Sequence, residues 1–302
     1  MPLTEPKTER NYCSRLGFAL LFAVVWAIAW QTALVGADFL LVEHFGVTMP
    51  DTVFYLLALV GHYLVSLPAG FALCRTVPRM PFTPTPPDAG RFGRWCAMGI
   101  ALMWLGSLVG SALSGWTYRL SGREPVEIVN EAFSQYPLSA VLLGACVIGP
   151  VCEELLFRRL VAGRLARYGE KPAAFVSALL FALYHGNLEQ FFYAFALGLL
   201  LAYVYFRTGQ LAAPIALHMV LNWYGSGIPS LLPDSDAILV LYGMSWLVLT
   251  ASGLALFARR WRHQVWLHGV SEPSMRTVFG NAGMVLALVA CFVQTVINFV
   301  LT

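Results

Sequence analysis

Charged residues are scarce in this sequence of 302 residues. Asp, Glu, Lys and Arg together make up 12% of the chain, whereas 58% of the residues are hydrophobic. A soluble globular protein is closer to a quarter charged. The formal net charge of +3 is small and lies between the apolar runs, so it gives no indication of a nucleic-acid partner. The composition predicts an all-α polytopic membrane protein whose surroundings are the lipid bilayer.

The sequence also lacks the common signatures of disulfides, zinc sites and covalent catalysis. Its six cysteines form no CxxC pair, and most fall in or beside apolar runs, so we expect no disulfide framework. Cys152 stands next to a carboxylate, which disfavours its thiolate, and we interpret it as a small core residue. The HExxH zinc motif is absent. Because no serine or threonine, and no cysteine other than Cys152, stands beside a base within the apolar runs, a covalent acyl-enzyme is disfavoured.

The chain contains many long apolar runs. About 8–9 of them are long enough, or nearly so, to cross the ~30 Å of bilayer hydrocarbon as helices. The first begins after three basic residues and is expected to be a membrane helix that is not cleaved as a signal peptide. The expected spans are 16–37, 52–74, 96–118, 138–160, 172–186, 189–206, 211–226, 237–258 and 277–301.

The segments between the spans alternate in charge. Lys7, Arg10 and Arg15 precede the first span, the next segment is acidic, and the Pro-rich segment after it is basic again. By the positive-inside rule this predicts a cytoplasmic N-terminus, and we expect a bacterial plasma (inner) membrane. Pro78 to Pro87 is interpreted as a semi-rigid linker, and residues 124–133 as a short amphipathic surface helix.

One stretch places ionisable groups inside an apolar helix. Residues 150–159 read Pro-Val-Cys-Glu-Glu-Leu-Leu-Phe-Arg-Arg, after twelve residues without any charge. Ionisable residues at membrane depth are expensive and indicate a functional site. Glu154 and Arg158 are four residues apart and share a helix face, which predicts a structural ion pair. Glu153 points about 100° away and is left without a helical cation, as a general base would be. The alternative is an ion-pair network that only ties helices together.

Further polar side chains follow in the next apolar runs. His185 ends one run, and His218 and Asn222 share a face of another. At 1.5 Å per residue, an antiparallel hairpin would bring Glu153 and His185 to one level, in a cavity that we expect to face the cytoplasm. His62 lies in the second run and is interpreted as an ordinary core histidine.

These residue types favour hydrolysis. Glu153 with His185 can activate a water molecule, and His218 with Asn222 can donate N–H groups to a developing oxyanion. The same Glu153, His185 and His218 could instead bind a divalent metal ion such as zinc, and the sequence leaves both options open.

Three motifs resemble one known family. EExxxR at Glu153 to Arg158, FxxxH at Phe181 to His185 and HxxxN at His218 to Asn222 occur in the order found in the CAAX-protease and bacteriocin-processing (CPBP, or Abi) family of intramembrane endopeptidases. Its eukaryotic members include the type II CAAX prenyl endopeptidase. The resemblance implies that Glu153 and His185 activate water and that His218 and Asn222 form the oxyanion hole. Glu154 and Arg158 would then have supporting roles.

The resemblance covers residues 138–226, so we expect three parts: N-terminal helices and the Pro-rich loop (1–137), a CAAX-protease-like catalytic core (138–226) and C-terminal helices (227–302). The substrate would be a membrane-bound or lipid-modified polypeptide. One alternative is a non-catalytic immunity or assembly factor of the same fold. A proton-coupled transporter is less favoured because several spans are nearly free of charge.

Overall fold

The computed structural model describes residues 6–124, 136–260, 266–267 and 275–301. These residues form helices and no β-strand, so the protein is an all-α polytopic membrane protein, as its composition predicted. The amphipathic helix expected at 124–133 lies almost wholly outside the described residues.

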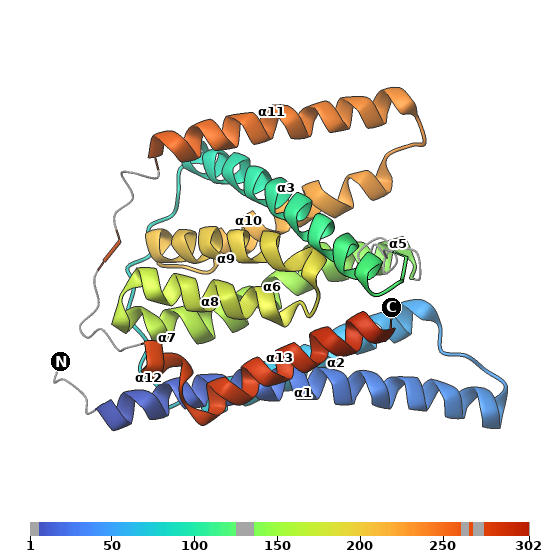
Figure 1. The fold of residues 1–302 in the computed structure, drawn as a ribbon, viewed down its shortest axis with the longest axis horizontal. Coiled ribbons are helices and arrows are strands. Elements are labelled where there is room, and N and C mark those ends of the chain that lie inside the picture. Colours follow the sequence, from blue (N-terminus) through green and yellow to red (C-terminus); the bar gives the residue numbers. More distant parts are fainter. Residues whose placement is uncertain (1–5, 125–135, 261–265, 268–274, 302) are drawn as a thin grey trace.

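Two groups of helices flank a central one (Figure 1). On one side, α1 (Pro6–Phe45) packs against α2 (Asp51–Leu73) and α13 (Ala282–Leu301), which joins the two ends of the chain. On the other side, α3 (Ala89–Leu120) packs against α11 (Asp236–Arg260). The central group lies between the flanking helices and contains Glu153, Glu154, Arg158, His185, His218 and Asn222.

The central group begins with one continuous helical stretch from residue 138 to 168. It comprises α5 (Leu138–Leu143), α6 (Gly149–Glu154) and α7 (Gly163–Leu165), separated by wider π-helical segments and closed by a 3₁₀ turn. Next come α8 (Glu170–Tyr184), α9 (Leu188–Thr208) and α10 (Ala212–Asn222). The short α12 (Met275–Phe279) leads into α13.

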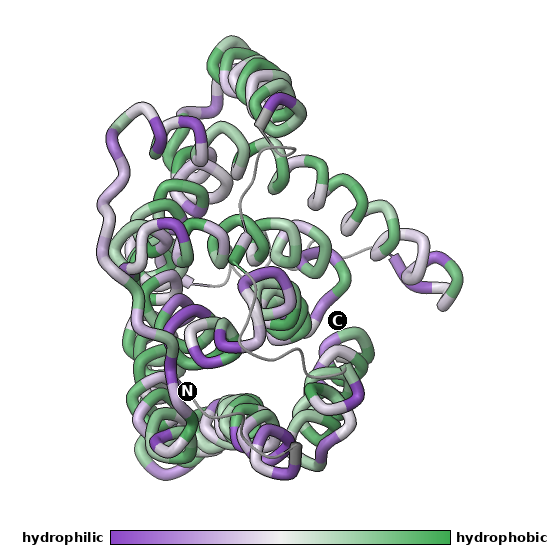
Figure 2. The backbone as a smooth tube through the Cα atoms, turned by 90° about the vertical axis from the view of Figure 1, so that its left-hand side faces the viewer, coloured by the Kyte–Doolittle hydropathy of each residue, from purple (hydrophilic) through white to green (hydrophobic). Residues whose placement is uncertain are grey.

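Within the described ranges, seven helices are long and apolar enough to cross a membrane. They correspond to seven of the nine expected spans. The exceptions, 172–186 and 211–226, form α8, which has 15 residues, and α10, which has 11 residues and is continued by a π-helical turn at Trp223–Gly227. At 1.5 Å per residue each of these stretches reaches at most about 24 Å, short of the hydrocarbon thickness. Figure 2 shows apolar residues on helices all around the bundle, as a lipid-facing surface requires.

Glycine allows two of these helices to approach closely. A Cβ atom added to Gly110 of α3 would lie 2.2 Å from the carbonyl oxygen of Glu189, in the first turn of α9. Gly106, one turn earlier, meets the α9 backbone in the same way. Close packing of backbones through small residues is the usual way in which membrane helices associate. The contact fixes the start of α9 beside the turn that follows α8.

The Pro-rich segment is attached to the central group. The backbone N–H of Met80 donates to the carbonyl oxygen of Gly163, and that of Thr85 donates to the carbonyl oxygen of Thr208. The ring of Phe82 lies against Tyr205. The expected semi-rigid linker therefore runs as a strap over the ends of two central helices.

Candidate active site

The helix that carries the glutamate pair changes its hydrogen-bond register twice. Residues 144–148 and 155–162 are π-helical, and they bracket the short α6, where Glu153 and Glu154 lie. π-Helical turns are rare and occur frequently at functional sites. The carboxylates thus stand on a segment whose orientation is set by the wide turns on either side.

Pro150 explains the first wide turn. Proline has no backbone N–H and its ring crowds the carbonyl group four residues earlier. Just before it, the N–H of Gly149 donates to the carbonyl oxygen of Gly144, five residues back. The carbonyl oxygen of Ala145 then has neither its α-helical nor its π-helical donor. The side chain of Asn222 replaces the missing backbone donor, because its Nδ2 donates to the carbonyl oxygen of Ala145 at 2.8 Å.

Glu154 forms the centre of a buried network. Its Oε2 lies 2.9 Å from Nε of Arg158, and both side chains are fully buried. Its Oε1 lies 3.0 Å from Nδ1 of His218. The Arg158 guanidinium also donates to the hydroxyl of Ser177 and lies over the ring of Phe181. The ion pair expected from the i, i+4 spacing is present, and it holds His218 in addition.

Glu153 has a different environment. Its side chain is 18% exposed, and Oε2 lies 3.6 Å from Nε2 of His218. Tyr63 of α2 forms a side-chain hydrogen bond with this carboxylate, and Tyr184 of α8 and Tyr193 of α9 lie near it. We did not anticipate these tyrosines, because they lie outside the three motifs. The adjacent carboxylates therefore differ as expected: one is locked in an ion pair and the other remains accessible.

His185 is held in a defined orientation at the end of α8. Its Nδ1–H donates to the carbonyl oxygen of Phe181 at 2.8 Å, so in the neutral ring Nε2 is the remaining acceptor. The Phe181 ring meets the rings of His185 and His218 edge-on, with centroids 4.8 and 5.8 Å away. Tyr193 lies near both His185 and Glu153. The structure thus brings the residues of all three motifs into one neighbourhood.

The turn after His185 lies within the bundle, and side chains form hydrogen bonds with its backbone groups. Asn187 accepts a hydrogen bond from the N–H of Gln190 and donates to the carbonyl oxygen of His185. Asn298 of α13 donates to the carbonyl oxygen of Gly186 at 3.1 Å. Gly186 has a φ of +65°, which favours glycine. A turn at membrane depth needs such partners.

The possible metal ligands do not converge. Among the residues that the structure describes, no group of three or more His, Cys, Asp and Glu side chains is arranged to hold a metal ion. Nδ1 of His218 is bonded to Glu154 and Nδ1 of His185 to a backbone carbonyl, so Nε2 is the ring atom that each histidine could offer to a metal ion. The zinc site that the sequence left open, with Glu153, His185 and His218 as ligands, stays a prediction.

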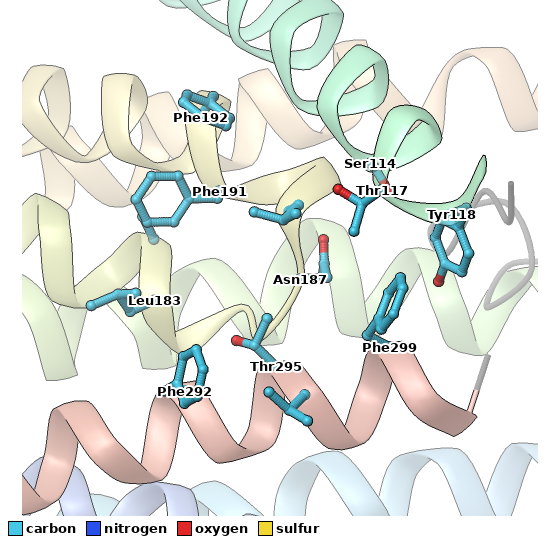
Figure 3. A pocket seen from close by; sticks show the side chains of 13 residues that line it. Ser114, Thr117, Tyr118, Leu183, Asn187, Phe191, Phe192, Phe292, Thr295 and Phe299 are labelled. Atoms are coloured by element: carbon cyan, nitrogen blue, oxygen red, sulfur yellow. The ribbon is translucent and has the colours of Figure 1, made fainter. Parts of the chain in front are cut away.

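Two cavities lie near the site. One, of about 440 Å³, is apolar and is bounded by α3, α8, α9 and α13; Figure 3 shows the rings of Phe191, Phe292 and Phe299 around it. The other, of about 300 Å³, lies between α1, α2, the end of α8 and α13 and is bordered by Tyr63 and Tyr184. The second cavity, hereafter the polar chamber, extends towards Tyr55 and Tyr136, where α2 and α5 begin. The charge pattern of the sequence predicts that the cytoplasm lies at the other end of the bundle. The chamber therefore does not extend towards the cytoplasmic side, from which we had expected water to enter.

Comparisons with known proteins agree with the motif positions. Residues 135–224 match the family model described as type II CAAX prenyl endopeptidase Rce1-like. The Bacillus subtilis protein named "Putative membrane peptidase YdiL" is 22% identical over 170 residues, which cover 51% of this chain and 67% of that protein. The Staphylococcus aureus protein named membrane-embedded CAAX protease MroQ is 36% identical over 85 residues.

The second similarity covers 26% of this chain and 34% of the staphylococcal protein, so the chain spans about a third of that relative. No solved structure matches the chain. The family-model match spans the segment that carries the glutamate pair, His185 and His218.

Proposed function

The chain belongs to the CAAX-protease (CPBP) family of membrane proteins through residues 135–224, and on that premise we propose that it is an intramembrane endopeptidase. The observation that carries the proposal is the unequal environment of the glutamate pair. Glu154 is buried in an ion pair with Arg158, whereas Glu153 is partly exposed beside His218. A catalytic base must reach water, and a structural carboxylate need not.

In the proposed reaction Glu153 accepts a proton from water, with Nε2 of His185 as the second acceptor that orients it. The resulting hydroxide attacks the carbonyl carbon of the scissile peptide bond. The proton passes from Glu153 to the leaving nitrogen as the C–N bond breaks, so the carboxylate is regenerated. Tyr63 and Tyr184, which interact with Glu153, help to hold it in place.

The oxyanion would be stabilised by His218 and Asn222, and the geometry limits how. Because Nδ1 of His218 donates to Glu154, Nε2 can donate only when the ring is doubly protonated. Glu154 and Glu153 lie on either side of the ring, with carboxylate oxygens 3.0 Å from Nδ1 and 3.6 Å from Nε2. Asn222 uses one amide hydrogen for the carbonyl oxygen of Ala145 and has a second one free to donate.

The proposed substrate is a membrane-bound or lipid-modified polypeptide, which matches an active site within a bundle of membrane helices. We also propose a bacterial plasma membrane location with a cytoplasmic N-terminus, supported by the alternation of basic and acidic segments along the chain.

A cleavage assay tests the function. The purified protein is reconstituted in lipid vesicles with a library of membrane-embedded peptides, and products are identified by mass spectrometry. We expect cleavage by the wild-type protein and none by the Glu153→Gln variant. If the two samples give the same products, a contaminating protease is responsible. If the folded wild-type protein cleaves no peptide, the non-catalytic alternative, a membrane immunity or assembly factor, is favoured.

A further inference from the structure

The polar chamber has a more polar lining than the apolar cavity near it. Its wall carries seven side chains with hydrogen-bonding groups, contributed by α1, α2, α8, α13 and the turn before α5. Polar groups at membrane depth are costly unless they have a partner or a function. The seven are Gln31, Tyr55, His62, Tyr63, Tyr136, Tyr184 and Gln294.

The chamber adjoins the proposed catalytic base. Tyr63 and Tyr184 form part of its wall; Tyr63 forms a side-chain hydrogen bond with Glu153, and Tyr184 lies near that carboxylate. His62 is joined to the same group, because its Nε2 lies 2.5 Å from the hydroxyl of Tyr184. The histidine interpreted from the sequence as an ordinary core residue therefore belongs to a polar group that runs from the chamber to the site.

Two polar atoms of the wall have no partner. Nδ1 of His62 and Oε1 of Gln294 are buried without a hydrogen bond. Buried polar atoms in native proteins nearly always have a partner, and leaving one unsatisfied costs about 1–3 kcal/mol. Small side-chain rotations towards a bound group would satisfy them. The wall thus presents unmet hydrogen-bonding capacity beside the site.

The chemistry of the wall identifies the occupant. A hydrocarbon chain would leave these amide, imidazole and phenol groups unpaired, and it fits the neighbouring apolar cavity better. A polypeptide backbone offers one donor and one acceptor per residue, which match glutamine, tyrosine and histidine side chains. The volume of about 300 Å³ lies at the lower end of ligand sites, ~300–1,000 Å³, and suits a short segment.

We propose that the polar chamber is a substrate subsite that binds the polypeptide chain next to the scissile bond, with His62, Tyr55 and Gln294 as its hydrogen-bonding residues. This inference rests on the proposed peptidase function and adds where the substrate chain lies. Side chains on α1, α2 and α13, outside the motif-bearing core, would then select which peptides are cleaved.

Photo-crosslinking tests the subsite. Benzoylphenylalanine is placed at Ala58, in the chamber wall, in a Glu153→Gln background that binds peptide without cutting it. The control position is Leu64 on the same helix, whose side chain is 68% exposed on the outer surface. Biotinylated peptides from the library are the probe. We expect crosslinked peptide from position 58 and none above background from position 64.

A second variant reports on specificity. Ala58→Phe, with Glu153 intact, narrows the chamber without touching the catalytic groups. We expect cleavage to shift towards peptides with small side chains at one position beside the scissile bond. One result would contradict the subsite and leave the proposed peptidase function intact. In that result the wild-type protein cleaves peptides, position 58 crosslinks only lipid, and Ala58→Phe leaves the peptide preference unchanged. Peptide crosslinking without any wild-type cleavage would contradict the peptidase and leave a peptide-binding chamber.

Discussion

Two neighbouring glutamates in one helix have unlike surroundings because successive side chains point about 100° apart. Glu154 faces Arg158 and His218 in the protein interior, and Glu153 faces a cluster of tyrosines. A single helical spacing rule predicted the first contact from the sequence. It did not predict the contacts of His218 with both carboxylates, because these depend on how α10 is placed against α6.

At the residue scale, Ser177 supports the buried guanidinium. Its hydroxyl accepts from Nη1 of Arg158 and donates to the carbonyl oxygen of Phe157. Ser177→Ala leaves one N–H of a buried cation unpaired. We therefore expect the free energy of unfolding to fall by about 1–3 kcal/mol, while the activity per folded molecule is retained. Thermal unfolding in detergent measures this. Ser252→Ala on α11 is the control, because that hydroxyl is exposed and bonds only within its own helix; an equal loss there would contradict the account.

At the scale of elements, the π-helical turns explain why the motif residues meet. The sequence indicated that Pro150 interrupts an apolar helix, but the register change and the orphaned carbonyl of Ala145 follow from three-dimensional geometry. From the sequence, Asn222 was therefore assigned only a role in stabilising the oxyanion. The structure adds that its side chain donates to the carbonyl oxygen of Ala145, in the π-helical turn that precedes the glutamate pair.

A double-mutant cycle separates the two roles of Asn222. Asn222→Ala should lower stability, because the Ala145 carbonyl loses its donor, and lower turnover by ~10²-fold if the amide also stabilises the oxyanion. Pro150→Ala restores a backbone N–H that Ala145 can accept. Combined with Asn222→Ala, it should recover the unfolding temperature but not the turnover. Recovery of both would remove Asn222 from the oxyanion hole.

The contact between α3 and α9 positions the His185 turn. Gly110→Ala places a methyl group against the backbone of Glu189, two residues after Asn187. We expect a loss of about 1–3 kcal/mol in stability and reduced cleavage. Gly93→Ala on the same helix meets nothing within 4 Å and is the matched control. It should be neutral or stabilising by up to ~1 kcal/mol, because alanine favours helix. Equal unfolding temperatures for both variants would argue against this positioning role.

At the scale of the whole molecule, the sequence predicted the fold class and seven of the spans well, because long apolar runs are a strong signal. It could not predict that α13 returns to pack beside α1, or that α2 supplies Tyr63 to the site. Those contacts join residues far apart in the chain, and no local pattern encodes them. The division into three parts stays a prediction.

The orientation in the membrane is testable by labelling. Single cysteines replace Arg91 and Asp234, both exposed, in a variant whose partly exposed Cys96 and Cys152 are alanine. A membrane-impermeant maleimide added to intact cells should label position 234 and spare position 91, because basic segments stay in the cytoplasm. Labelling of position 91 alone would invert the proposed topology.

The account as a whole depends on the division of roles between Glu153 and Glu154, and one paired measurement tests it most directly. Cleavage per folded molecule and unfolding temperature are measured in the same preparations of Glu153→Gln and Glu154→Gln. Glu153→Gln should abolish cleavage and unfold like the wild type. Glu154→Gln should lower the free energy of unfolding by about 3–5 kcal/mol, because it leaves the buried Arg158 without its ion-pair partner. Equal losses of folded protein in both variants, or full cleavage by Glu153→Gln, would contradict the account.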